Sequence, residues 1–119
     1  MSDRLTHECG LAFVRLRKPL HYYQEQYGDA AWGLRKTYLL MQKQYNRGQD
    51  GAGLGVVKFD MPAGDPFLLR VRSDKHNAIE RIFDAITEDT ERLSNAITAE
   101  TELNAKQTCR FLGETYLGH

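Results

Sequence analysis

Cysteines, prolines and long apolar runs are all scarce in this 119-residue sequence. The two cysteines, Cys9 and Cys109, are too few and too far apart for a disulfide framework, and no Cys-x-x-Cys pair indicates a zinc site. No apolar run approaches membrane-spanning length, and the first residues lack the basic and apolar regions of a secretory signal. We therefore expect a cytoplasmic protein without a metal site.

An excess of charge of one sign is also missing. The 16 lysine and arginine residues balance the 16 aspartate and glutamate residues, which gives a formal net charge of 0. Such a chain has no overall field that attracts nucleic acid or an anionic membrane, and we expect neither as a partner. Its length and its 41% hydrophobic residues are typical of one globular domain.

Hydrophobic patterns predict strands and helices along most of the chain. We expect a strand that begins at Cys9, a pair of antiparallel strands at residues 55–59 and 67–72, and a further strand opening within residues 111–119. Apolar residues at helical spacing predict one helix over residues 30–45 and a long one after Asn77, where Glu80 completes the pattern of a capping box. Residues 21–29 are consistent with a loop or a short helical turn.

Glu8-Cys9-Gly10 is the first candidate site. A thiol becomes a good nucleophile when a base lies beside it, and a free α-amino group with a pKa of about 7.7 to 8.0 is such a base. Removal of residues 1–8 would place this amine on Cys9 itself, and Gly10 leaves room for a substrate. The alternative is that Cys9 is a small buried hydrophobic residue, as most unpaired cysteines are. We expect Cys109 to be structural.

The second candidate site is the segment Arg-Gly-Gln-Asp-Gly-Ala-Gly at residues 47–53. Its backbone N–H groups and the guanidinium of Arg47 are suited to a position beside an active site. It lacks the Lys-Ser/Thr of a P-loop, and its glycines lead into a strand instead of opening a helix, which disfavours a phosphate or dinucleotide site. A tight connection between a helix and a strand explains the glycines equally well.

Together the two segments resemble the glutaminase domain of class II glutamine amidotransferases, in particular that of the amidophosphoribosyltransferases. The family pattern is Cys-Gly after a short propeptide, then a strand, a helix and His-Arg-Gly-Gln-Asp-(Ala/Gly)-Ala-Gly. Residues 46–53 match this last segment except at Asn46. Residues 113–119, Gly-Glu-Thr-Tyr-Leu-Gly-His, are similar to the approach to the family's Gly-His-x-Arg-Tyr segment.

The resemblance implies an α+β fold of the N-terminal nucleophile hydrolase type, an αββα sandwich of two antiparallel sheets between helical layers. Residues 1–8 would be a propeptide-like leader, and residues 9–119 the N-terminal part of the glutaminase domain. Cys9 would attack the side-chain amide of glutamine, while Arg47 and Gly48 would orient the new N-terminus and line the pocket. The parent enzyme would pass the ammonia to a phosphoribosyl acceptor domain in purine biosynthesis, and no cofactor is implied within this chain.

Two features that the family places after its Gly-His segment are absent from this sequence: the arginine that binds the substrate α-carboxylate and the Asn-Gly pair of the oxyanion hole. We therefore expect a sandwich that is incomplete at its C-terminal end, little glutaminase activity from this chain by itself, and association between copies through uncovered sheet surfaces. Two alternatives stay open. The glutaminase chemistry could serve another synthase, or the domain could be a non-catalytic scaffold in which Cys9 is never unmasked.

Overall fold

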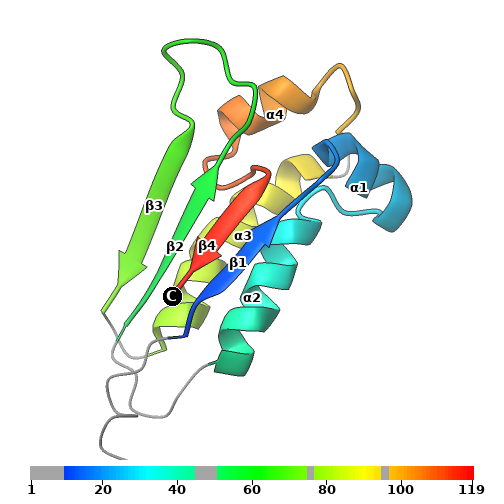
Figure 1. Cartoon of the computed structure of the whole chain (residues 1–119). Coiled ribbons are helices and arrows are strands. Elements are labelled where there is room, and N and C mark those ends of the chain that lie inside the picture. Colours follow the sequence, from blue (N-terminus) through cyan, green and yellow to red (C-terminus); the bar gives the residue numbers. More distant parts are fainter. Residues whose placement is uncertain (1–9, 45–50, 75–76, 95–96) are drawn as a thin grey trace, which may run out of the picture.

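The computed structural model describes residues 10–44, 51–74, 77–94 and 97–119. Within these residues the chain forms a four-stranded antiparallel sheet and four helices, which is an α+β fold (Figure 1). In chain order the elements are β1 Ala12–Arg15, α1 Leu20–Tyr27, α2 Trp32–Gln44, β2 Ala52–Val57, β3 Leu68–Ser73, α3 Ala78–Ser94, α4 Glu102–Thr108 and β4 Thr115–Gly118. The α+β class that the resemblance implies is confirmed.

The last strand completes the middle of the sheet. The strand order is β1-β4-β2-β3, so β4 pairs with both β1 and β2. Tyr116 of β4 lies opposite Val14 on one side and Val56 on the other, and its side chain is fully buried. The antiparallel pairing of β2 with β3, predicted from the sequence, is confirmed by a register that runs from Ala52 and Ser73 to Val57 and Leu68.

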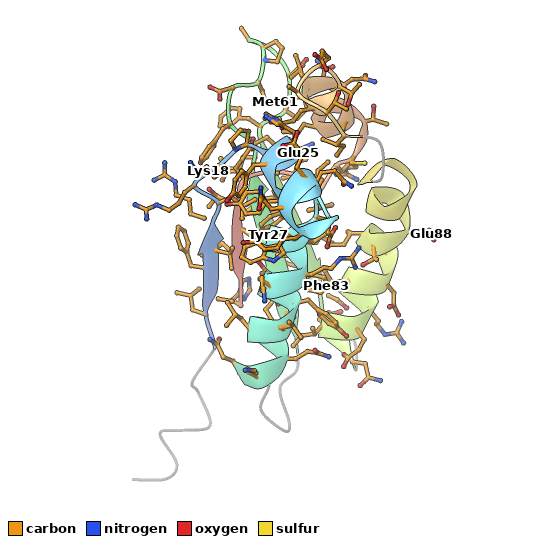
Figure 2. All side chains as sticks on the ribbon, turned by 90° about the vertical axis from the view of Figure 1, so that its right-hand side faces the viewer. Lys18, Glu25, Tyr27, Met61, Phe83 and Glu88 are labelled. Carbon is orange, nitrogen blue, oxygen red and sulfur yellow. The ribbon has the colours of Figure 1, made fainter. Side chains whose placement is uncertain are left out.

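Helices α2 and α3 cover one face of the sheet. Helix α2 packs on β1 and β4, α3 packs on β2 and β3, and both lie behind the sheet in Figure 1. Figure 2 shows Phe83 between the two helices, where its ring centroid lies 4.7 Å from that of Tyr38. The predicted apolar stripes are confirmed by the burial of these helix residues: Leu34 and Met41 of α2, and Ile79, Ile82, Phe83 and Ile86 of α3.

The opposite face of the sheet is open. It carries two neighbouring apolar side chains, Phe13 of the edge strand β1 and Leu117 of β4, which are 59% and 44% exposed. Leu68 at the edge strand is 57% exposed. None of the helices and strands in the described part of the chain covers this face, which is the one nearest the viewer in Figure 1.

The structure corrects several boundaries predicted from the sequence. Strand β1 begins at Ala12, whereas we expected its start at Cys9, which lies outside the described residues. The segment after Pro19 is a full helix, α1, which ends where Gly28 adopts a φ of 71°. Strand β2 begins at Ala52, three residues earlier than expected. Helix α4 was not predicted at all.

The start of α3 also differs from the sequence-based expectation. The predicted capping box at the start of α3 needs an extended Asn77, but this residue has a φ of 60°. Asn77 contributes a backbone contact instead, since its carbonyl oxygen accepts a hydrogen bond of 3.0 Å from the backbone N–H of Arg81.

No helix in the described ranges has both the length and the apolar composition needed to cross a membrane.

Candidate functional site

The chain segments that flank the two candidate sites, residues 8–10 and 47–53, lie at one end of the sheet. Strands β1 and β2 begin at this end, and β3 and β4 finish there, because each neighbouring pair is antiparallel. Helix α2 also ends there, at Gln44 (lower end of the sheet in Figure 1). We call this the motif end of the sheet.

The three residues predicted to form the site, Cys9, Arg47 and Gly48, lie outside the described residues. In the sequence, Cys9 directly precedes Gly10, while Arg47 and Gly48 belong to the connection between Gln44 and Gly51. The structure therefore describes the residues that flank them, and these flanking residues lie at the motif end.

Gly10 and the last turn of α2 approach each other closely. The Gln44 side chain donates a hydrogen bond from Nε2 to the carbonyl oxygen of Leu11, at 3.0 Å. A Cβ atom at Gly10 would lie 2.5 Å from Gln44 Oε1 and 2.6 Å from Gln44 Cβ, too close for either. Glycine at position 10 thus allows the segment before β1 to pass directly beside the end of α2.

Gly53 has the same role for the C-terminal end of β4. Its N–H donates to the carbonyl oxygen of His119 and its carbonyl oxygen accepts from the His119 N–H, both at 3.0 Å. A Cβ atom at Gly53 would lie 2.3 Å from Nε2 of the imidazole, so the glycine lets this ring lie across β2. Gly53, in the second candidate segment, therefore allows His119 to lie next to the start of β2.

A hollow of about 440 Å³ lies beside this imidazole. It is lined by Leu54, Arg70, Val71, Arg72 and His119. Arg70 and Arg72 alternate with inward-facing residues of β3 and stand opposite Gly55 and Gly53 of β2, so both lie on the open face of the sheet. Sequence reasoning missed them, although two arginines spaced i, i+2 in a predicted strand are expected to share a face.

The described residues provide no metal site at this end. A cavity between Gly10, Met41, Gln44, Ile79 and His119 has a volume of about 10 Å³. This is about the minimum that one water molecule needs. In the parts of the chain that the structure describes, no group of three or more His, Cys, Asp and Glu side chains is placed to hold a metal ion.

The titratable groups that burial perturbs lie at the other end of the sheet. Burial there lowers the pKa of Lys58 below its ordinary value of 10.5. Burial also raises the pKa of Tyr116, whose hydroxyl accepts a hydrogen bond of 3.0 Å from the Gly113 N–H. The motif end is instead built from glycines, main-chain hydrogen bonds and exposed arginines.

Comparison of the chain with protein-family models, with curated proteins and with solved structures found no match.

Proposed function

We propose that this chain is the N-terminal part of a glutaminase domain of the class II glutamine amidotransferase type, with Cys9 as its nucleophile. The observation that carries the proposal is the convergence at the motif end. Gly10 and Gln44, which are more than 30 positions apart in the sequence, come into contact there. Gly51 lies next to Ser73 of β3 and leads into β2 at the same end of the sheet. A thiol at position 9 and a guanidinium at position 47 need such a shared frame to act on one substrate.

The reaction proposed for Cys9 proceeds in two halves. After removal of residues 1–8, the α-amino group of Cys9 takes the thiol proton, and the thiolate attacks the side-chain carbonyl carbon of glutamine. The amine returns the proton to the leaving nitrogen, which departs as ammonia and leaves a thioester. The same amine then takes a proton from a water molecule, whose oxygen attacks the thioester carbonyl carbon. The C–S bond breaks, glutamate is released, and the amine returns its proton to the Cys9 thiolate. In the parent protein the ammonia passes to a phosphoribosyl acceptor in purine biosynthesis.

The open face of the sheet supports the finer fold assignment. An αββα sandwich needs a second sheet packed about 10 Å from the first. Phe13 and Leu117 form an exposed apolar patch for such packing, and helices α2 and α3 already occupy the other face. We propose that a second antiparallel sheet of the parent protein covers this face.

The hollow beside His119, with Arg70 and Arg72 in its lining, favours a substrate that carries a carboxylate. The guanidinium groups of Arg70 and Arg72 lie on the face that the second sheet would cover, next to His119 at the motif end. Guanidinium groups bind carboxylates through paired, charge-assisted hydrogen bonds. The α-carboxylate of glutamine matches this chemistry, and in the parent protein Arg70 and Arg72 would act on it together with the arginine that the family places after its Gly-His segment.

The decisive experiment uses the full-length parent protein. Mass spectrometry of the mature chain should find Cys9 as its first residue, and a diazoketone analogue of glutamine should label Cys9. Cys9→Ser should abolish both labelling and ammonia release, whereas the matched variant Cys109→Ser, at a buried cysteine, should keep both. Ammonia release by a mature chain that retains residues 1–8 would contradict the mechanism. An intact leader without ammonia release would favour the non-catalytic scaffold.

A further inference from the structure

Another cavity lies at the end of the sheet away from the motif end, between α4 and the loop that joins β2 to β3. Its volume is about 250 Å³, and Met61 of the loop is labelled beside α4 in Figure 2. The six residues of β2 separate the two ends, a distance of about 20 Å at roughly 3.3 Å per residue. The cavity is lined by Lys58, Met61, Asp65, Pro66, Leu69, Lys106, Gln107 and Arg110.

Two lysines in the cavity wall are almost fully buried. Lys58 is 4% exposed and Lys106 is 3% exposed. The charge of Lys106 is neutralised, because its Nζ lies 2.8 Å from Glu114 Oε2 and also donates to the carbonyl oxygen of Phe59 at 2.6 Å. Lys106 thus has a carboxylate counter-charge from the protein.

Lys58 has no such counter-charge. Its Nζ donates two hydrogen bonds, to the carbonyl oxygens of Lys106 and of Cys109, the latter at 2.7 Å. An ammonium group has three N–H donors, so one is left over. Within the described ranges, no carboxylate lies at ion-pair distance from Lys58. Burial lowers its pKa, which is the behaviour of a cation whose charge the protein compensates incompletely.

The rest of the lining combines one further cation with apolar surface. Arg110 is exposed at the rim, and Asp65 is engaged by Gln107, whose Nε2 donates to Oδ2 at 2.8 Å. Met61, Pro66 and Leu69 form an apolar side. A cavity of about 150 Å³ is enough for a benzene ring, so this one has room for a ring and a carboxylate.

We propose that this cavity binds a small carboxylic acid with an apolar body. The carboxylate takes the third N–H of Lys58 and the guanidinium of Arg110, while the apolar body lies against Met61, Pro66 and Leu69. The competing explanation is purely structural: Lys58 satisfies the last carbonyl groups of α4, as lysines near helix C-termini do. Only the first explanation requires affinity for an anion.

Benzoate is the test ligand, titrated into the full chain by calorimetry and by amide NMR. We expect saturable binding, with shifts at α4 and residues 58–69, and roughly tenfold weaker binding of the neutral analogue benzamide. Inorganic phosphate, which lacks an apolar body, should bind more weakly than benzoate. Equal affinity for benzamide would overturn the role of charge, and equal affinity for phosphate would overturn the role of the apolar side. An absence of binding would overturn the site itself.

Substitutions separate the ligand from the structural role of Lys58. Arg110→Gln, at an exposed residue, should weaken benzoate binding roughly threefold without unfolding the chain. The matched control Arg81→Gln changes an exposed arginine of α3 outside the lining and should leave binding unchanged. Lys58→Met should weaken binding roughly tenfold or more if the chain stays folded. Unchanged affinity in Arg110→Gln, or in a folded Lys58→Met, would overturn the proposal.

Discussion

Glu114→Gln tests the buried ion pair that joins α4 to the start of β4. The side chains of Lys106 and Glu114 are 4% and 6% exposed, and their charged atoms lie 2.8 Å apart. Glu114 also accepts a hydrogen bond at Oε1 from the Phe59 N–H, at 2.9 Å. A glutamine keeps an acceptor for that N–H group but removes the charge opposite Lys106.

The size of the effect follows from the burial of both groups. Removing one partner of a buried ion pair costs about 3–5 kcal/mol, because the other charge is left buried without compensation. A domain has a free energy of unfolding of about 5–15 kcal/mol, so the variant loses a large part of its stability. The double variant Lys106→Met/Glu114→Gln also removes the second charge. Its free energy of unfolding should exceed that of Glu114→Gln by about 2 kcal/mol or more, because neither residue of the pair then carries a buried, uncompensated charge.

Urea unfolding followed by circular dichroism measures both variants against the unchanged chain. Glu25→Gln is the matched control, because Glu25 is exposed on α1 (Figure 2) and its loss should change the free energy of unfolding by less than about 0.5 kcal/mol. A cost below about 1 kcal/mol for Glu114→Gln would show that the Lys106 charge does not depend on the pair. A double variant less stable than Glu114→Gln would refute the same reasoning.

Three further predictions use the same chain. A Cβ at Gly118 would lie 2.4 Å from Met41 Sδ, so Gly118→Ala should push α2 off β4 and cost about 1–3 kcal/mol in urea unfolding, unlike Gly55→Ala, whose Cβ would have its nearest neighbour at 3.8 Å. Because burial lowers the pKa of Lys58 below 10.5, the unfolded chain binds more protons between that lowered pKa and 10.5. The stability of the unchanged chain relative to Lys58→Met should therefore rise with pH across this window in urea titrations. Finally, the isolated chain should release little ammonia from glutamine, and turnover near the ordinary enzyme rate of about 10 s⁻¹ would contradict this expectation.

The sequence predicts the elements whose patterns are local. Leu34 and Met41 recur at helical spacing and are buried in α2, and the stripe after Asn77 forms the buried side of α3. The turn-rich segment at residues 60–66 correctly predicts the antiparallel pairing of β2 with β3. In each case the information lies within about 20 residues, and spacing alone is enough.

Two parts of the fold, α4 and the position of β4, could not be predicted from local sequence patterns. Residues 102–108 have no apolar stripe, and α4 is held instead by polar contacts with residues far away in the chain, including those of Lys58 with its final carbonyl groups. The position of β4 between β1 and β2 depends on pairing across more than 50 residues, which no periodicity records. The capping pattern at Asn77 was misleading, because this residue adopts a φ of 60° instead of the extended conformation that a capping box needs.

The candidate site divides in a similar way. Cys9, Arg47 and Gly48 come from motif matching, and their own positions are outside the described residues. The contributions of Gly10 and Gly53 became visible only with the fold, because their neighbours Gln44 and His119 are distant in sequence. A glycine pattern shows that something comes close to the backbone, but it does not identify the neighbour.

The arginines on the open face link the fold proposal to the proposed chemistry. If a second sheet covers this face, Phe13 and Leu117 gain an apolar partner surface, but Arg70 and Arg72 lose water. An unpaired buried cation is strongly unfavourable, so each guanidinium then needs an anion. The α-carboxylate of a bound glutamine can supply one, and a carboxylate on the second sheet must supply the other unless both arginines share the substrate. A covering sheet without any acidic residue facing β3, together with a bound glutamine whose carboxylate contacts only one of the two arginines, would therefore conflict with the sandwich proposed for the parent protein.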